Sequence, residues 1–206
     1  EAEPEPPRNL RAVAGVLEGI APLGDAWRNL IAFTARYYQR SLGEVALATL
    51  PPQLRDLNSE QLARRLRRPA KSQAAQETPE FIALSAEQER AIGQIHAKSG
   101  PFLLYGGTGS GKTEVYLRCV QAALDAHPAA QALVMVPEIN LTPQLEARFT
   151  ARFGADSVVS LHSGMTNPQR LKSWLAAHSG AARIVLGTRM AVFASLPGLA
   201  LIVVDE

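Results

Sequence analysis

The sequence is poor in cysteine, in aromatic residues and in net charge. Among its 206 residues there is one cysteine, Cys119, and aromatic residues make up 6%. A single cysteine excludes an internal disulfide framework and any zinc site built from several thiolates of this chain, which fits a reducing cytosol. The formal net charge is only +2. Any affinity for nucleic acid must therefore come from local patches and not from a global basic field.

The sequence also lacks a membrane-spanning run and a basic signal region. No apolar stretch reaches the roughly 20 residues that a bilayer-spanning helix needs. Residues 1–7 are acidic and rich in proline, which is the opposite of a secretory signal. These absences predict a soluble, cytoplasmic protein without a membrane partner.

Both ends of the chain predict a fragment of a longer protein. The chain begins at Glu1 without a methionine and stops at Glu206, directly after an apolar run that is typical of a central strand. A domain rarely ends inside its core, so we expect an internal fragment. With 47% apolar residues, the chain has room for one core and part of a second domain.

Residues 1–55 predict the end of a small α+β domain. Residues 10–17 are a weak strand candidate, and residues 41–49 form a short helix that must end before Pro51 and Pro52, because proline cannot continue a helix. Between them we expect a longer helix with Asp25 as its N-cap. The inner face of that helix carries Trp27, Leu30, Ile31, Thr34 and Tyr38.

Residues 56–80 predict a charged linker. A short helix begins near Asn58 and gives way to a stretch of proline, alanine, glutamine and serine. Its arginines could bind nucleic-acid phosphates, but a solvated helix face is the favoured interpretation of such a charge run. The cluster comprises Arg64, Arg65, Arg67 and Arg68.

Residues 81–206 alternate between amphipathic helices and short apolar strands. Such alternation predicts an α/β domain with a mostly parallel sheet and helices on both faces. The expected helices are residues 85–98, 111–126, 141–153 and 167–177, and the expected strands are residues 101–105, 131–136, 157–161, 183–187 and 199–205.

A phosphate-binding loop follows the first of these strands and opens a helix. Residues 106–113 match the pattern G-x4-G-K-[ST] in the context that the pattern requires. The glycines let successive amide N–H groups point at an anion, Lys112 reaches the β- and γ-phosphates, and the Thr113 hydroxyl binds Mg2+. The predicted ATP and Mg2+ site comprises Gly106, Gly107, Thr108, Gly109, Ser110, Gly111, Lys112 and Thr113.

Two acidic residues end the last apolar strand. Asp205 is expected to hold the Mg2+ from the other side, and Glu206 to activate the attacking water. Many strands end in a solvated aspartate, but this pair follows a phosphate loop in the same predicted sheet, which favours the catalytic interpretation. Gln88, about twenty residues before the loop, carries an amide that could recognise an adenine edge. A lone glutamine on a helix is otherwise usually solvated.

Three further segments follow predicted strands at the edge where open parallel sheets bind ligands. They are residues 136–144, 161–164 and 187–189. Singly, each is explained as a turn or a helix cap. Together, their hydroxyl groups, exposed amides and one arginine suit the backbone of single-stranded DNA. The candidate DNA contacts are His162, Ser163, Thr188 and Arg189.

These motifs resemble those of the PriA (primosomal protein N′) family of replication-restart helicases, in helicase superfamily 2. The resemblance runs from about Leu10 to Glu206, and its most specific part is Val-Pro-Glu-Ile-x-Leu-Thr-Pro-Gln at residues 136–144. It implies a P-loop NTPase fold of the RecA-like type, with residues 81–206 as the first helicase lobe. The stretch around Tyr37 and Tyr38 is similar to the end of the family's N-terminal domain, which recognises the 3′ end of a nascent strand.

The resemblance implies an ATP-dependent 3′-to-5′ DNA helicase that binds abandoned forks and helps to reload the replicative helicase. The implied partners are forked and single-stranded DNA, single-stranded DNA-binding protein and other primosome proteins, at a bacterial nucleoid. Gln88 would then bind adenine. The family's zinc site and second lobe would lie in the missing C-terminal part, so the fragment alone is expected to be nearly inactive.

One departure concerns the region between the two domains. Only about thirty residues separate them, which is too few for the family's winged-helix domain. Two alternatives stay open: another superfamily 2 DNA translocase, such as a recombination or restriction helicase, or a non-catalytic fork-binding fragment.

Overall fold

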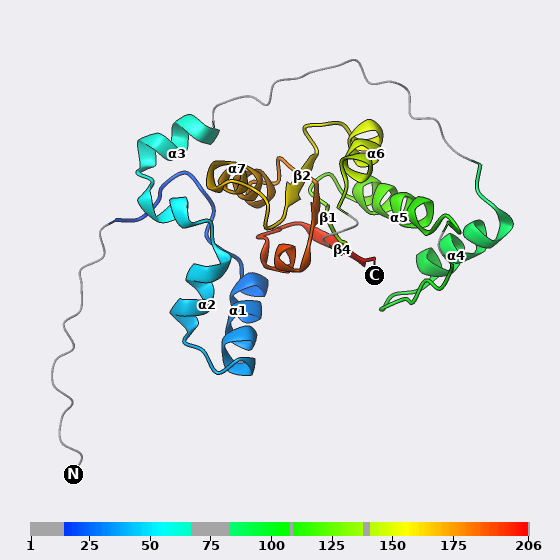
Figure 1. Cartoon of the computed structure of the whole chain (residues 1–206), viewed down its shortest axis with the longest axis horizontal. Helices are drawn as coiled ribbons and strands as arrows, with labels where there is room; N and C mark the ends of the chain where they lie inside the picture. The colour runs from blue at the N-terminus through cyan, green and yellow to red at the C-terminus, as the bar shows by residue number, and fades with distance from the viewer. Residues whose placement is uncertain (1–14, 67–82, 108, 138–140, 206) are drawn as a thin grey trace, which may run out of the picture.

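A computed structural model describes residues 15–66, 83–107, 109–137 and 141–205 of the chain (Figure 1). Its centre is a four-stranded parallel sheet in the order β2-β3-β1-β4. The predicted α/β class with a parallel sheet is therefore confirmed. The strands are β1 (Gln131–Met135), β2 (Val158–Leu161), β3 (Ile184–Gly187) and β4 (Leu199–Val204).

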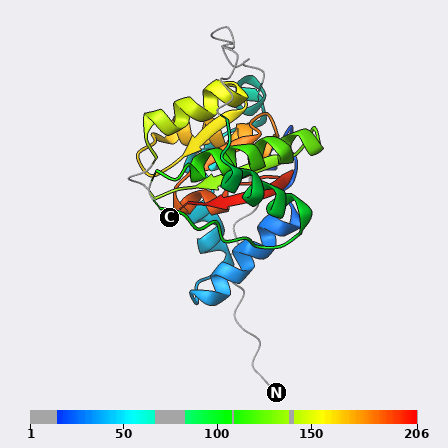
Figure 2. The same ribbon diagram turned by 90° about the vertical axis from the view of Figure 1, so that its right-hand side faces the viewer.

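Helices cover both faces of the sheet, as the alternation predicts. Side chains of successive residues in β1 point to opposite faces: Val134 packs under α5 (Lys112–Ala126) and α6 (Pro143–Phe153), and Leu133 packs on the other side. That other side is covered by α7 (Asn167–His178) and a short 3-10 helix, η3 (Arg189–Phe193). Figure 2 shows α5 and α6 in front of the sheet.

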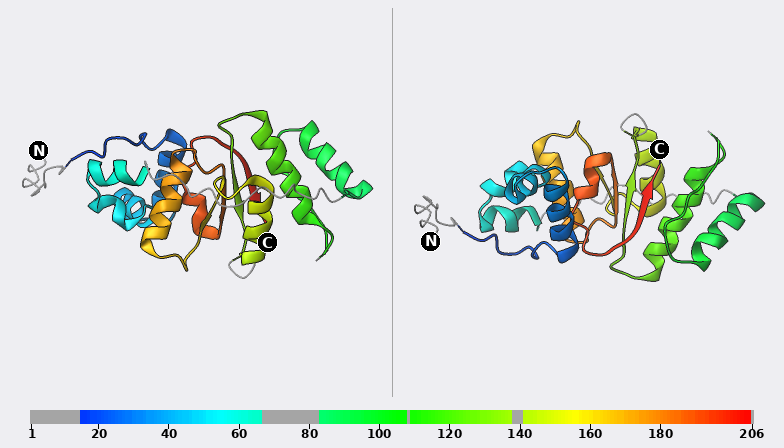
Figure 3. Two further views of the ribbon diagram at one scale, coloured as in Figure 1. Left: turned by 90° about the horizontal axis from the view of Figure 1, so that it is seen from above. Right: turned by 90° about the horizontal axis from the view of Figure 1, so that it is seen from below.

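The N-terminal helices pack on the face that carries α7 and η3 (Figure 3). The indole of Trp27 donates a hydrogen bond to the Phe193 carbonyl at 2.9 Å, and Leu62 is fully buried in a cluster with Leu171 and Trp174. This region comprises α1 (Asp25–Tyr37), α2 (Leu42–Thr49), a 3-10 helix η1 (Pro52–Asp56) and α3 (Ser59–Leu66). The helix α3, within the predicted linker, thus belongs to the folded body because its one apolar face is buried.

Two details of α1 differ from the prediction. Gly24 is the N-cap and Asp25 is the first helical residue, with its carboxylate bound by Arg28 and not by the helix N-terminus. Of the predicted inner face, Ile31 is buried, whereas Tyr38, the C-cap of the helix, is exposed. The weak strand candidate at residues 10–17 lies mostly outside the described residues, and residues 15–17 form no strand.

The predicted strand at residues 101–105 is wrong. The segment has no regular structure and lies apart from the sheet, beside α4 (Ala86–Ala97), with Leu103 and Tyr105 exposed by 92% and 94% (Figure 1). A β-strand needs a hydrogen-bonded partner strand. Among the described strands none pairs with this segment, and β4, at the edge of the sheet, pairs with β1 alone. The other four predicted strands are confirmed within two residues at each end.

Candidate nucleotide site and adjoining sheet edge

The phosphate-binding loop joins residues 101–105 to the N-terminus of α5. Gly109 and Gly111 both have φ near +80°, a region that side chains disfavour, and Gly111 is the N-cap of α5. Within the loop the Ser110 amide donates to the Gly107 carbonyl at 3.2 Å. The loop therefore ends in the free amides of a helix N-terminus, which suit a phosphate group. Thr108 lies outside the described residues.

Lys112 folds back over this loop. Its ammonium group donates to the carbonyl oxygens of Gly106 at 2.7 Å and Gly107 at 3.1 Å. A side chain on Gly106 would meet the Ser110 hydroxyl at 2.6 Å, so the loop is tightly closed around these groups. Both of these acceptors are neutral carbonyls, and a phosphate oxygen is a stronger partner for an ammonium group. The loop residues therefore fit a nucleotide.

Gln88 lies at the loop, where the sequence places it, but its amide group is already engaged. Its Oε1 accepts from the Ser85 amide at 2.8 Å, which completes the capping box of α4. Its Nε2 donates to the carbonyls of Ser110 at 3.4 Å and Gly111 at 3.3 Å. Gln88 thus ties α4 to the phosphate loop. The recognition of adenine by this residue stays a prediction.

Asp205 is connected to α5 through Tyr116. The Tyr116 hydroxyl donates to Asp205 Oδ2 at 3.3 Å, and the Asp205 amide donates to the Met135 carbonyl at 2.8 Å. Burial raises the pKa of Tyr116, a hydrogen bond with Thr113 lowers that pKa, and Asp205 raises it. A phenol has one hydrogen, and Tyr116 donates it to Asp205; in the hydrogen bond between Thr113 and Tyr116 the Thr113 hydroxyl is therefore the donor.

Tyr116 lies in the predicted helix at residues 111–126 but is not among the site residues that the sequence predicts. Its spacing from Thr113 is one turn of the helix, which places both side chains on the same face. In the sequence, that spacing is the one feature that places Tyr116 next to a predicted Mg2+ ligand. Glu206, the predicted water-activating residue, lies outside the described residues, as do residues 138–140 of the predicted DNA segment.

A buried ion cluster lies one residue after Thr113. Glu114 Oε1 accepts from Arg118 Nε at 2.9 Å on the same helix and from Arg152 at 2.8 Å on α6. Burial raises the pKa of Glu114, but the two arginines outweigh it and leave the pKa below its usual value. The first turn of α5 is therefore fixed to α6 by a charged contact.

The ends of the four strands meet at one edge of the sheet through backbone hydrogen bonds. The amide of Thr188 donates to Leu161 at 3.2 Å, that of Val136 to Gly187 at 2.9 Å, and that of Asp205 to Met135 at 2.8 Å. The sheet thus brings the ends of three predicted DNA-contacting segments into the same row as Asp205.

The four predicted DNA contacts differ in exposure. Arg189 and Ser163 are exposed and His162 is half-buried. Thr188 is buried, and its carbonyl accepts from the Ala191 amide at 2.8 Å in the first turn of η3. Its side chain therefore offers little surface to a ligand, and the exposed groups of this edge come from its neighbours.

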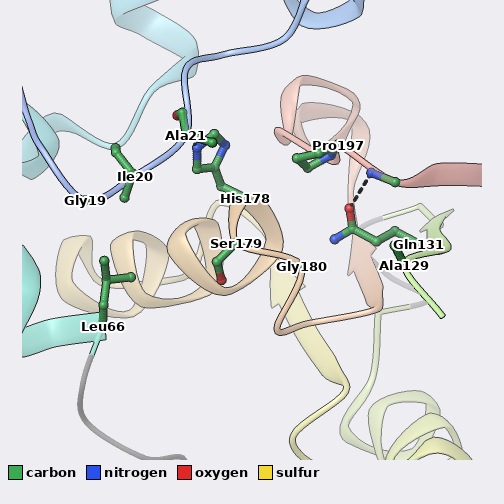
Figure 4. A pocket seen from close by; sticks show the side chains of 11 residues that line it. Gly19, Ile20, Ala21, Leu66, Ala129, Gln131, His178, Ser179, Gly180 and Pro197 are labelled. Atoms are coloured by element: carbon green, nitrogen blue, oxygen red, sulfur yellow. Dashed lines mark hydrogen bonds between the residues drawn. The ribbon is translucent and has the colours of Figure 1, made fainter.

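A pocket of about 590 Å³ lies at the opposite, amino end of the sheet (Figure 4). Gln131 donates from Nε2 to the carbonyls of Ala177 and Ala182 and accepts from the Gly198 amide, all within 2.9 Å. Both ring nitrogens of His178 also have partners at 2.8 Å. The contact between His178 and the Ala21 carbonyl holds the N-terminal segment against the sheet domain, whereas the bonds of Gln131 lie within that domain. The pocket therefore lies between the N-terminal segment and the sheet domain and is not the nucleotide site.

The described part of the chain contains neither a cluster of three metal-binding side chains nor a helix long and apolar enough to cross a membrane. The predicted Mg2+ site would not count as such a cluster, because its expected protein ligands are only one hydroxyl, of Thr113, and one carboxylate, of Asp205. Phosphate oxygens and water complete the coordination of Mg2+ at sites of this kind.

Comparison with known proteins points in the same direction as the geometry. Residues 85–206 match the family model described as DEAD/DEAH box helicase. The replication restart protein PriA of Haemophilus influenzae is 44% identical over 127 residues, which is 61% of this chain and 17% of that protein.

Two further relatives bear the same name. PriA of Treponema pallidum is 37% identical over 174 residues, covering 84% of this chain and 25% of the relative. PriA of Rickettsia prowazekii is 32% identical over 206 residues, which cover 99% of this chain and 28% of the relative. The chain therefore spans between about a sixth and about a quarter of the length of these three relatives.

Proposed function

Because the chain belongs to the DEAD/DEAH box helicase family, we propose that it is the nucleotide-binding part of an ATP-driven DNA helicase of replication restart. The single observation that carries this proposal is the row of strand ends that joins Asp205 to the candidate DNA segments. A helicase couples ATP hydrolysis to movement along DNA, and this edge would carry both an ion ligand and the candidate DNA contacts. The names of the relatives favour replication restart over the other DNA translocases of superfamily 2.

In this proposal each residue of the site has one task. The loop amides and Lys112 bind the phosphates, Thr113 and Asp205 hold the ion, and Glu206 orients the attacking water. Mg2+, when bound, neutralises charge that develops on the phosphate oxygens. To bind the adenine edge, Gln88 would exchange its bonds to the carbonyls of Ser110 and Gly111 for bonds to the base. We propose that Arg189 and Ser163 contact the DNA backbone.

The finer features of the activity follow from the same resemblance. We propose 3′-to-5′ unwinding at abandoned forks, with single-stranded DNA-binding protein and other primosome proteins as partners at the nucleoid. The residues before about position 55 would contribute to recognition of the fork. A zinc site and a second lobe, outside this chain, would complete the enzyme.

The test is ATP hydrolysis by the full-length protein with and without forked DNA. Lys112→Ala should abolish DNA-stimulated hydrolysis but leave fork binding largely intact, because the phosphate contacts and the fork contacts are separate sites. Lys172→Ala, an exposed lysine on α7, is the matched control and should behave as wild type. Hydrolysis without DNA stimulation in the wild type, or an unchanged rate in Lys112→Ala, would exclude the helicase. Fork binding without any hydrolysis would favour the non-catalytic alternative.

A further inference from the structure

Tyr116 occupies a fixed position between the two groups that are expected to hold Mg2+. Its side chain is 6% exposed and belongs to the main core cluster. The ring stacks on Phe149 of α6, with 6.3 Å between centroids and 18° between planes. Packing alone therefore holds the ring in place, so the hydroxyl projects to a constant point at the end of β4.

The two hydrogen bonds of this hydroxyl have a definite direction. A phenol has one hydrogen to donate and lone pairs to accept. Tyr116 gives its hydrogen to Asp205 Oδ2 and receives the hydrogen of Thr113. The consequence for Thr113 is specific: its hydrogen points to Tyr116, so its oxygen lone pairs are free for a cation. The consequence for Asp205 is that one carboxylate oxygen is fixed and the orientation of the other is set.

We propose that Tyr116 is a positioning residue that orients Thr113 and Asp205 for the Mg2+ that accompanies the nucleotide. The inference rests on the proposed function, because it assumes that these two residues bind the ion. Tyr116 does not contact the ion or the phosphates. It acts through its neighbours, as hydrogen-bonding partners of metal ligands do in other sites.

A merely structural tyrosine would make a different contribution. The aromatic ring fills space against Phe149, and phenylalanine would fill it equally well. The hydroxyl is the one part that reaches the two ligands. Tyr116→Phe therefore separates orientation from packing, and Tyr116→Leu, which removes the ring, provides the variant in which packing is lost.

The experiment measures nucleotide binding, not turnover, in the full-length protein. A fluorescent ADP analogue is titrated at a series of Mg2+ concentrations and again in EDTA. In Tyr116→Phe the Mg2+ concentration for half-maximal binding should rise at least about ten-fold, the lower end of the effect of removing a partner of a metal ligand. Binding in EDTA and the melting temperature should stay close to those of the wild type. Tyr37→Phe, an exposed tyrosine on α1, is the control for loss of a hydroxyl.

The outcomes separate this inference from the proposed function. If the wild type shows no Mg2+-dependent nucleotide binding, the proposed site itself is wrong and the role of Tyr116 is excluded with it. If the wild type binds with Mg2+ and Tyr116→Phe has the same Mg2+ dependence, the role of Tyr116 alone is excluded. A loss in EDTA equal to the loss in Mg2+, or a fall in melting temperature as large as that of Tyr116→Leu, would show that Tyr116 serves packing only.

Discussion

Removing the carboxylate of Glu114 should destabilise the chain far more than removing the guanidinium group of Arg118, the more exposed of its two arginine partners. Glu114 and Arg152 have side chains that are each 9% exposed, whereas Arg118 is 26% exposed. Breaking a buried pair by deleting one member costs about 3–5 kcal/mol, because the other charge stays buried. We therefore expect Glu114→Ala to lower the free energy of unfolding by about 3–5 kcal/mol. Arg118→Ala should cost about 1 kcal/mol, because Arg152 remains with the carboxylate.

The dependence on pH gives this prediction a sign as well as a size. The pKa of Glu114 in the fold lies below its usual value of 4.5, since the bonds and charges of Arg152 and Arg118 outweigh the effect of burial. The stabilisation by the charged carboxylate is therefore complete above the unfolded pKa and is lost as pH falls from there through the folded pKa. The difference in stability between wild type and Glu114→Ala should shrink below about pH 4.5.

Urea unfolding followed by circular dichroism at pH 7 and at several lower pH values measures both quantities. Asp125→Ala is the matched control, because Asp125 is an exposed acidic residue on the same helix that accepts a hydrogen bond from Gln121 at 2.9 Å on the surface. Its change should stay within about 0.5 kcal/mol. Equal losses for Glu114→Ala and Arg118→Ala, or a difference that grows as the pH falls, would refute the reasoning.

Two further substitutions test the site and the sheet edge. Gly111→Ala should weaken nucleotide binding and lower the melting temperature, because a left-handed residue with a side chain costs about 1–2 kcal/mol and the new Cβ would lie 2.3 Å from Gln88 Nε2; wild-type binding in this variant would contradict the observed loop. Arg189→Ala should weaken single-stranded DNA binding equally for all sequences and reduce the slope of log affinity against log salt by about 1. An unchanged slope in a salt titration would remove Arg189 from the DNA contacts.

The parts of the fold that were predicted correctly depend on local chemistry. The start of α4 follows from Ser85 and Gln88, which satisfy the first amides of the helix within four residues of sequence. The start of α5 follows from the glycines of the phosphate loop, two of which adopt a positive φ. The alternation of strands and helices predicted the parallel sheet because a parallel pair needs a crossover between its strands.

The failures come from features that depend on partners distant in sequence. Residues 101–105 have the composition of a strand, but pairing is decided by which edge is available, and composition carries no information on that. Tyr116 finds Asp205 across 89 residues, and Glu114 finds Arg152 across 38. On the sequence alone, a tyrosine and a glutamate inside an amphipathic helix are explained by packing and by solvation. For each residue, the side-chain type is equally consistent with that explanation and with a specific contact to a distant residue. Only the folded structure distinguishes the two.

The two contacts that were missed have a common consequence for the nucleotide site. Both hold the first turns of α5: Glu114 fixes it to α6, and Tyr116 fixes it to the end of β4. The helix α6 begins within the predicted DNA segment at residues 136–144, and β4 ends directly before Asp205, the predicted ligand of the ion. Because buried, hydrogen-bonded contacts resist stretching, a shift of α5 on binding nucleotide has to move these neighbours or break a bond. The phosphate loop, α6 and the end of β4 are therefore connected, and substitutions in either contact should be measured for both nucleotide binding and DNA binding.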